Sequence, residues 1–195
     1  MSIALIVGAY LLGSIASAIV VCRLLGLPDP RLGGSGNPGA TNVLRLGGRK
    51  AAAVTLLGDV LKGVLPVALA QALAAPPAVL AATALAAFLG HLFPVFFGFR
   101  GGKGVATAFG ALLALAPVAA LVALLVWLAV AALARFSSLA SLSACVAAPL
   151  YLWWAGAPGA YAAALTVMAV LLIWRHRGNI QRLLSGRESR IGQKA

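Results

Sequence analysis

The sequence predicts an all-α protein, a polytopic bundle of transmembrane helices built as one domain, residues 1–195. Two observations carry this prediction. Hydrophobic residues make up 63% of the chain and charged residues only 9%, a balance outside the soluble globular class. Several apolar stretches also approach or exceed the roughly 20 residues with which a helix crosses a bilayer. Helices are expected because lipid offers no partner to backbone polar groups.

Six apolar runs are separated by short polar connections. They are Ser2–Cys22, Ala51–Leu73, Ala78–Phe97, Val105–Ala134, Ser137–Trp154 and Gly159–Trp174. The first run has no basic residue before it, so we expect a retained span rather than a cleaved signal peptide. The fourth is too short for two full spans and contains Pro117, which predicts a hairpin of two short helices. The total is seven helices, namely five full spans and this hairpin.

Positive charge predicts the orientation of the bundle. The connections 74–77 and 156–159 carry no charge, whereas lysines and arginines lie in the other connections and in the tail from Arg175 to Lys194. The positive-inside rule then puts the N-terminus outside the cell and the C-terminus in the cytoplasm. The rule also accounts for the net charge of +12, so no nucleic-acid partner is expected. Five spans, with residues 105–134 re-entrant, have the same orientation and remain an alternative.

Three polar stretches, residues 33–50, 90–107 and 175–192, are expected to meet at the cytoplasmic face. The first contains Ser35, Asn37, Thr41, Asn42 and Arg45. The arginine suits bidentate contact with phosphate, and the Asn-Pro-Gly sequence that begins at Asn37 is typical of a turn. Capping of short helices is the structural alternative for Ser35, Thr41 and Asn42.

The second stretch contains Gly101-Gly102-Lys103-Gly104, directly before the helix expected to begin at Val105. Glycines allow backbone N–H groups to approach an anion, and the helix N-terminus adds partial positive charge. This is suitable chemistry for phosphate, although a tight turn without a ligand is the structural alternative. Phe97 and Gly104 occupy the positions at which a Walker A loop needs glycine and serine or threonine, which disfavours ATP binding.

The third stretch contains His176, Asn179 and Glu188. On a continuing helix, His176 and Asn179 are three residues apart and face the same way. An anchor at the membrane interface is the structural alternative for a histidine between two arginines. Glu188 is expected to fix arginine or backbone groups of the tail rather than to do chemistry.

Acidic residues and cysteines are too few for several kinds of site. The three acids are Asp29, Asp59 and Glu188, too few for a paired-carboxylate hydrolase, so neither a metal nor a cofactor is expected. Asp59 and Lys62 are expected to form a structural ion pair. Cys22 and Cys145 are expected to be free thiols. Many cations and few anions indicate an anionic substrate, of which phosphate esters are the obvious class.

The three polar stretches together resemble the bacterial membrane-integral glycerol-3-phosphate acyltransferase family that uses acyl phosphate as donor. The resemblance covers the whole chain. The matching residues are Ser35–Asn42 with Arg45, then Gly90-His91, Phe93–Phe96 and Gly98–Thr107, then Arg175–Arg177, Asn179-Ile180, Arg182-Leu183, Gly186 and Glu188. Arg100 is a conservative departure from the lysine common in the family.

The resemblance implies transfer of a fatty acyl group to the 1-hydroxyl of glycerol 3-phosphate, which gives lysophosphatidic acid and phosphate. This is the first acylation of bacterial phospholipid synthesis, at the inner membrane with the active site facing the cytoplasm. The implied partners are acyl phosphate, glycerol 3-phosphate, membrane lipids and, transiently, the soluble enzyme that makes the acyl phosphate.

Two rival functions are disfavoured by the residues. Acyltransferases of the HxxxxD type need an aspartate five residues after the histidine, but Phe96 follows His91 and Gln181 follows His176 at that distance. An anion transporter predicts polar residues near the middle of the membrane. The middles of the predicted spans are alanine, leucine and valine instead.

We expect catalysis to depend on Ser35, Arg45, Lys103, His176 and Asn179, without a covalent acyl-enzyme. The residues expected to bind substrate phosphate are Ser35, Asn37, Thr41, Asn42, Arg45, Gly101, Gly102, Lys103, Gly104, His176 and Asn179. His91 and Glu188 are expected to give structural support. Either His176 or a phosphate oxygen of the substrate removes the hydroxyl proton, and the cation-rich site slightly favours the phosphate.

Overall fold

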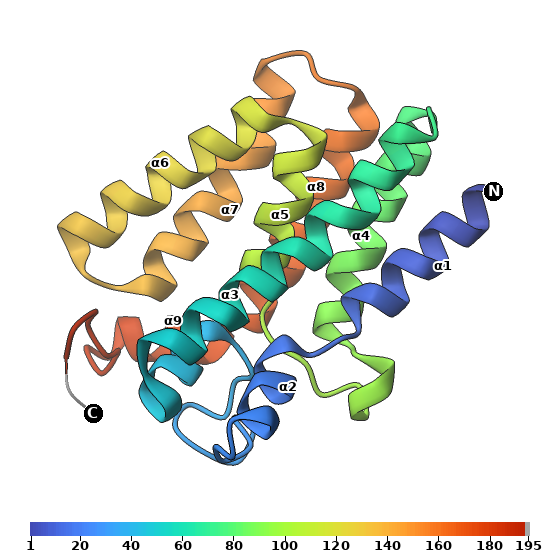
Figure 1. Ribbon diagram of the computed structural model, residues 1–195. Helices are drawn as coiled ribbons and strands as arrows, with labels where there is room; N and C mark the ends of the chain where they lie inside the picture. The colour runs from blue at the N-terminus through green and yellow to red at the C-terminus, as the bar shows by residue number, and fades with distance from the viewer. Residues whose placement is uncertain (194–195) are drawn as a thin grey trace. The chain divides into compact units, whose positions relative to one another are not determined.

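The computed structural model describes residues 1–193 and, in that part of the chain, contains helices and no β-strand (Figure 1). The predicted all-helical class is therefore confirmed. The elements are α1 (Ser2–Gly13), α2 (Ser17–Leu24), α3 (Ala40–Ala72), α4 (Pro77–Leu92), the 3₁₀ helix η1 (Val95–Phe97), α5 (Val105–Leu115), α6 (Pro117–Ala134), α7 (Ser137–Trp154), α8 (Gly159–Arg175) and α9 (Arg177–Leu184). The chain divides into two compact units, Met1–Leu115 and a second unit that begins at Ala116.

In the first unit, α1 packs against α4 through reciprocal glycine contacts. A Cβ added to Gly13 of α1 would overlap the Ala87 carbonyl, and one added to Gly90 of α4 would overlap the Tyr10 carbonyl. The Tyr10 hydroxyl donates to the Phe93 carbonyl at 2.7 Å. Small residues allow such close approach of helices in membranes, and here they fix the end of α4 against α1.

The pair α3 and α5 interlocks in the same way. A Cβ added to Gly63 of α3 would overlap the Thr107 carbonyl, and one added to Gly110 of α5 would overlap the Val60 carbonyl. Backbone therefore touches backbone at both places. This contact fixes the first turn of α5, which follows the glycine-rich part of the second polar stretch.

The first apolar run, expected to be one span over Ser2–Cys22, is broken into α1 and α2, which are bent by 43°. The Ser14 hydroxyl donates to the Tyr10 carbonyl at 2.8 Å, a side-chain bond that competes with the helical ladder. The break frees the carbonyl of Ile15, which accepts a hydrogen bond of 2.8 Å from Lys62 Nζ. The interruption is stable because a buried ammonium replaces the missing helical donor.

The helix α3 begins at Ala40, eleven residues before the expected start at Ala51. A kink at Gly48, with φ 75° and ψ −171°, divides the helix in two. The polar part before the kink is helical because Val43, which is fully buried, packs into a cluster with residues of α2. Part of the expected polar loop, including Arg45, is therefore helix.

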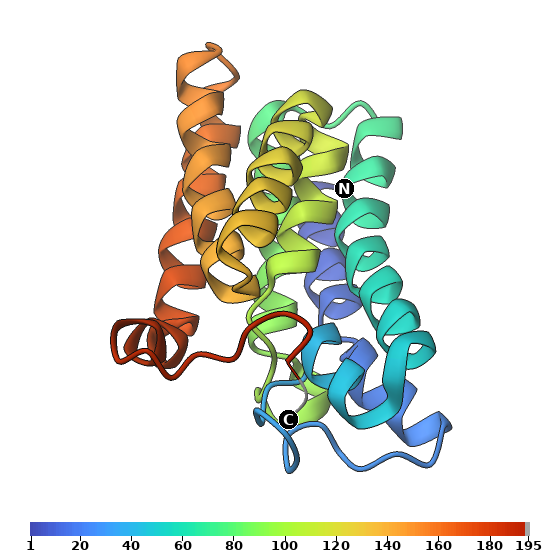
Figure 2. The same ribbon diagram turned by 90° about the vertical axis from the view of Figure 1, so that its left-hand side faces the viewer.

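In the second unit, α7 packs between α6 and α8, and α9 contacts both α7 and α8 (Figures 1 and 2). The predicted interruption near Pro117 is present: Ala116 has a non-helical backbone, with φ −152° and ψ 82°, and Pro117 is the first residue of α6. Proline suits that position because its missing N–H would have no helical partner. The seven expected helices become nine within residues 1–193, because the first run is broken and part of the tail forms α9.

By length and composition, three helical segments are apolar enough to cross a membrane: α3, α4 extended through η1, and α6. The number rises to five if the bent pairs α1–α2 and α8–α9 each count as one span. The helix α6 is by itself long and apolar enough to cross a membrane, although the sequence predicted only the second short helix of a hairpin there. The helix α5 is shorter, as expected.

Candidate active site

A buried carboxamide organises the first polar stretch. Asn42, only 1% exposed, donates from Nδ2 to the carbonyls of Pro30 at 2.8 Å and Gly33 at 3.0 Å. Its Oδ1 accepts a bond of 2.8 Å from the backbone N–H of Ser35. One side chain thus closes the loop that precedes α3. Asn42 shapes this loop, and the Ser35 side chain lies exposed upon it.

The capping interpretation of Ser35, Thr41 and Asn42 is wrong for α3. The residue before the helix is Gly39, and among residues 1–193 no side-chain hydrogen bond caps its N-terminus. The turn expected at Asn37 is confirmed, since the Gly39 N–H donates to the Asn37 carbonyl at 2.9 Å. Thr41 is exposed in the first turn of α3.

The glycine loop, Gly101–Gly104, lies between η1 and α5 and packs closely against residues of α4. A Cβ on Gly101 would overlap the His91 carbonyl, one on Gly102 would overlap His91 Nε2, and one on Gly104 would overlap the Phe88 ring. Gly104 also has φ +85°, in the region that favours glycine. Lys103, between these buried glycines, is half-buried just before the first residue of α5.

The first and second polar stretches meet within the first unit, as expected. Arg31 donates to the Phe97 carbonyl at 3.2 Å, and a Cβ on Gly102 would lie only 3.0 Å from the Pro38 carbonyl. Arg31 is itself held by Asp29, with 2.7 Å between Nη2 and Oδ2. The side-chain hydrogen bonds from Arg31 lower the pKa of Asp29 below its ordinary value. The carboxylate therefore stays ionised and keeps the arginine in place.

The expected ion pair of Asp59 and Lys62 is confirmed, with 2.9 Å between Lys62 Nζ and Asp59 Oδ1. The pair is buried, and it extends to two residues that the sequence did not connect with it. Asp59 Oδ1 lies 3.6 Å from His91 Nδ1, and His91 Nδ1 is hydrogen-bonded to Thr107 Oγ1 at 3.1 Å. His91 therefore sits between this buried network and the glycine loop.

The third polar stretch belongs to the second unit, where His176 lies at a bend of 58° between α8 and α9. The expectation of one continuing helix is wrong. The N–H of the His176 backbone still bonds to the Leu172 carbonyl, at 3.0 Å, but the imidazole Nδ1 lies 2.8 Å from that same oxygen. The ring thus folds back on α8 while α9 departs in another direction. His176 is 3% exposed and Asn179 8%.

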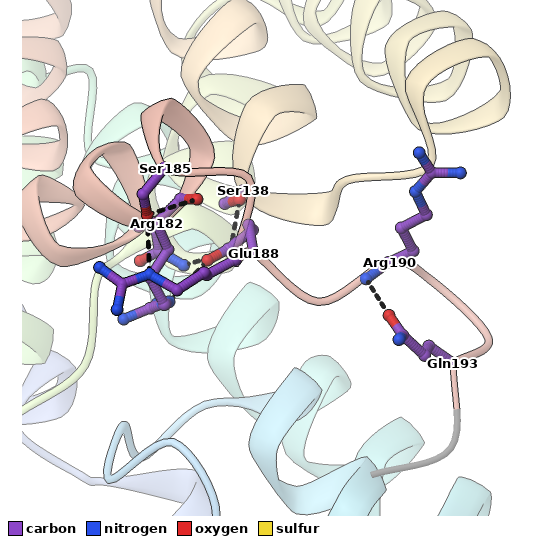
Figure 3. A network of polar contacts seen from close by, with 8 residues as sticks. Ser138, Arg182, Ser185, Glu188, Arg190 and Gln193 are labelled. Carbon is purple, nitrogen blue, oxygen red and sulfur yellow. Dashed lines mark hydrogen bonds and ion pairs between the residues drawn. The ribbon is translucent and has the colours of Figure 1, made fainter.

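Glu188 is the centre of a hydrogen-bond network in the second unit (Figure 3). Its Oε1 accepts from Ser138 Oγ at 2.7 Å and from Asn179 Nδ2 at 2.6 Å, and its Oε2 accepts from Arg182 Nε at 2.7 Å. Burial raises the pKa of Glu188, but these three hydrogen bonds outweigh burial and leave the pKa below its ordinary value of 4.5. The contact with Arg182 is of the expected kind, whereas no sequence signal indicated Ser138.

Replacing Glu188 with glutamine is expected to lower the free energy of unfolding at neutral pH by about 1.5–3 kcal/mol, the range for hydrogen bonds to a charged group. Because the folded-state pKa is lowered, the carboxylate stabilises the fold fully above the unfolded-state pKa, near 4.5. This stabilisation is lost as pH falls through the folded-state pKa. Thermal unfolding of both proteins from pH 7 to pH 3 checks this, and a difference independent of pH would contradict it.

All three acids are therefore paired with cations, Asp29 with Arg31, Asp59 with Lys62 and Glu188 with Arg182. Within residues 1–193, no group of three histidine, cysteine or acidic side chains lies together as a metal site would require.

The sequence model of a family described as "Glycerol-3-phosphate acyltransferase" matches residues 3–186. The chain belongs to this glycerol-3-phosphate acyltransferase family. The match runs through both compact units and includes Ser35, Arg45, Lys103, His176 and Asn179. Glu188 lies two residues beyond its end.

Curated members of the glycerol-3-phosphate acyltransferase family align along almost their whole length. The protein of Thioalkalivibrio sulfidiphilus is 58% identical over 191 residues, which cover 98% of this chain and 94% of the relative. That of Methylococcus capsulatus is 59% identical over 187 residues, which cover 95% and 94%. Both are named glycerol-3-phosphate acyltransferase.

Two solved structures of PlsY, an integral membrane glycerol 3-phosphate acyltransferase, share this fold. The glycerol 3-phosphate form is 47% identical, with a TM-score of 0.94 over 98% of this chain and 96% of that one. The lysophosphatidic acid form is 45% identical, with a TM-score of 0.90 over 98% and 95%.

Proposed function

We propose that this protein transfers a fatty acyl group from acyl phosphate to the 1-hydroxyl of glycerol 3-phosphate, forming lysophosphatidic acid and phosphate. One observation carries the acceptor and the product. The chain matches, over nearly its full length, an integral membrane acyltransferase solved in a glycerol 3-phosphate form and in a lysophosphatidic acid form. Helices apolar enough to cross a membrane agree with a lipid product that stays in the bilayer.

The first unit supplies chemistry for binding two anionic substrates. We assign Lys103 and the backbone of the glycine loop to phosphate, since a lysine between glycines before a helix presents positive charge and N–H groups together. Arg45, exposed on α3, supplies a second cation suited to phosphate. Ser35, Asn37 and Thr41 donate hydrogen bonds to the same substrates, and Asn42 contributes by holding the loop that carries Ser35.

An acyl phosphate donor fits the residues better than a thioester. A mixed anhydride is already activated, so positioning and electrostatic stabilisation suffice for direct attack by the glycerol hydroxyl. No covalent acyl-enzyme is then needed. The imidazole Nδ1 of His176 faces the Leu172 carbonyl, rather than the carboxylate that orients the histidine of HxxxxD enzymes. This favours a reaction that depends on phosphate as a good leaving group, rather than on activation of the hydroxyl by a histidine–aspartate pair.

The ring orientation of His176 suits either of two roles. Because Nδ1–H donates to the Leu172 carbonyl, we assign the contact with substrate to the other ring nitrogen, Nε2. Neutral Nε2 accepts a proton as a general base, whereas protonated Nε2 donates a hydrogen bond to phosphate. We favour phosphate binding by His176, with a substrate phosphate oxygen as the base. Asn179, whose Nδ2 is held by Glu188, is assigned to glycerol 3-phosphate.

Replacing His176 with alanine is therefore expected to raise KM for glycerol 3-phosphate about tenfold or more, the effect of losing one charge-assisted hydrogen bond, with kcat near normal. Gln181→Ala, a change at an exposed position of α9 five residues after His176, is the matched control. Steady-state kinetics of both variants check this. A fall of several orders in kcat with KM intact would show instead that His176 is the general base.

The proposed setting is the bacterial inner membrane, with the N-terminus outside, the C-terminus inside and the active site facing the cytoplasm. The charge distribution supports it, because the lysines and arginines follow the positive-inside pattern. The soluble enzyme that makes acyl phosphate is then a natural transient partner, since its product is needed on the same side of the membrane.

The deciding experiment is phosphate release by the purified protein from palmitoyl phosphate, with and without glycerol 3-phosphate, beside palmitoyl-CoA as a donor control. We expect release that depends on glycerol 3-phosphate, formation of lysophosphatidic acid, and no reaction with the CoA ester. Reaction with palmitoyl-CoA alone would overturn the proposed donor. No reaction with either donor in a folded protein would overturn the proposed function.

A further inference from the structure

A chain of buried polar side chains runs through the first unit from the α1–α2 break to the start of α5. Lys62 Nζ donates to the Ile15 carbonyl at 2.8 Å and lies 2.9 Å from Asp59 Oδ1. That oxygen lies 3.6 Å from His91 Nδ1, which is hydrogen-bonded to Thr107 Oγ1 at 3.1 Å. The side chains of Asp59 and Lys62 are each 4% exposed, His91 is 6% exposed and Thr107 is fully buried.

Stability alone gives little reason for such a chain. The desolvation of a buried ion pair offsets most of its attraction, and well-packed apolar residues at the same positions are often equally stable. A network of buried polar side chains in mutual contact does, however, restrict each member to one geometry. The network therefore acts through the element whose position it defines.

That element is the glycine loop, which His91 touches through both its backbone and its ring. The His91 carbonyl accepts a hydrogen bond of 3.2 Å from the Gly102 N–H. A Cβ on Gly102 would overlap His91 Nε2, and one on Gly101 would overlap the His91 carbonyl. The imidazole thus lies directly against the loop backbone beside Lys103. Its opposite edge, Nδ1, is the atom held by Thr107.

We propose that His91 is a positioning residue, which Asp59, Lys62 and Thr107 hold in one orientation so that its ring and carbonyl fix the glycine loop for phosphate binding. This inference rests on the proposed function, in which Lys103 and the loop backbone bind substrate phosphate. His91 acts through the loop. Asp59, Lys62 and Thr107 act through His91, and Thr107 also fixes the distance from the loop to the first turn of α5.

The test is Thr107→Val, which removes the hydroxyl that holds His91 Nδ1 and keeps the β-branched shape of the side chain. The expected result is a rise in KM for the phosphate substrates and a fall in kcat/KM of about ten- to hundredfold, as for small misplacements of a site by changes outside it. Thr107→Ser restores the hydroxyl and is expected to recover most of this loss.

Thr55→Val is the matched control. Thr55 is a fully buried threonine of α3 in the same unit, and within the described residues its hydroxyl has no hydrogen-bond partner. Both valine variants therefore lose one buried hydroxyl, but only Thr107→Val loses a contact with His91. We expect Thr55→Val to keep the kinetic constants of the unchanged protein, because replacing an unsatisfied buried hydroxyl by a methyl group costs nothing in hydrogen bonding.

A second readout is independent of activity. Amide hydrogen exchange of the segment 98–106 in detergent micelles reports the Gly102 N–H, which the His91 carbonyl protects. Faster exchange in Thr107→Val, with Thr55→Val unchanged, supports the positioning role. Equal exchange and equal kinetics in the two variants would overturn it. If the unchanged protein shows no acyltransferase activity, the proposed function fails, whereas the exchange comparison still decides whether this network positions the loop.

Discussion

Replacing Lys103 with methionine is expected to lower kcat/KM for acyl transfer about 10²- to 10³-fold, as does removal of one preorganised group from an anionic transition state. Lys103 is the only cation within the glycine loop, and its half-buried setting would strengthen the phosphate contact that we propose for it. Methionine keeps the length and the apolar stem of lysine, so the loss reports the charge. Initial rates of lysophosphatidic acid formation over a range of both substrates measure the effect.

The control for this prediction is Lys50→Met, at an exposed position of α3. It removes the same charge from the same unit and is expected to leave kcat/KM unchanged. Lys103→Arg keeps the charge but replaces a compact ammonium group with a larger, planar guanidinium group, so we expect only partial activity. Equal losses in the variants at positions 50 and 103 would mean that overall charge, rather than a phosphate contact at Lys103, supports the reaction.

Replacing Gly102 with alanine is expected to lower kcat/KM by about 10²-fold, the effect of displacing a binding group by about 1 Å. The added methyl group would overlap His91 Nε2 and lie 3.0 Å from the Pro38 carbonyl. Neither neighbour moves easily, because one belongs to a buried polar network and the other is backbone. The loop must therefore shift away from its position in contact with the His91 ring. Steady-state kinetics and thermal unfolding of the purified variant measure both consequences.

The matched control is Gly8→Ala in α1, where an added Cβ meets no atom of the described residues within 4 Å. That change is expected to leave activity and stability intact, because alanine is also the better helix former. If Gly102→Ala retained full activity, the glycine loop would tolerate displacement, and the dependence of the reaction on the position of this loop would be contradicted.

The helices and the residues of the candidate site follow from local features of the chain. Apolar runs longer than a soluble helix needs predicted the helical bundle, and Pro117 predicted the interruption that the structure places at Ala116. The ion pair of Asp59 and Lys62 followed from their spacing of one helical turn. Glycines beside Lys103 predict phosphate chemistry. Each inference needs only residues that are near one another in the sequence.

Other features depend on partners that are distant in the sequence. The break after α1 is stabilised by Lys62, 47 residues from the Ile15 carbonyl that it reaches. The early start of α3 depends on burial of Val43 against α2. Glu188 depends on Ser138, 50 residues away. No periodicity or motif encodes these pairs, because a carbonyl freed in one helix and a donor on another become neighbours only when the helices pack.

By itself, the sequence determined that this chain is an all-helical protein with apolar segments, because composition and periodicity are local properties. Its motifs also predict phosphate chemistry for three polar stretches. Only the tertiary structure decided what several of those polar residues do. Asn42 closes its own loop, His91 lies between a buried ion pair and the glycine loop, and His176 occupies a bend instead of a helix interior. The physical reason is that a polar side chain takes its role from the partner it finds on folding.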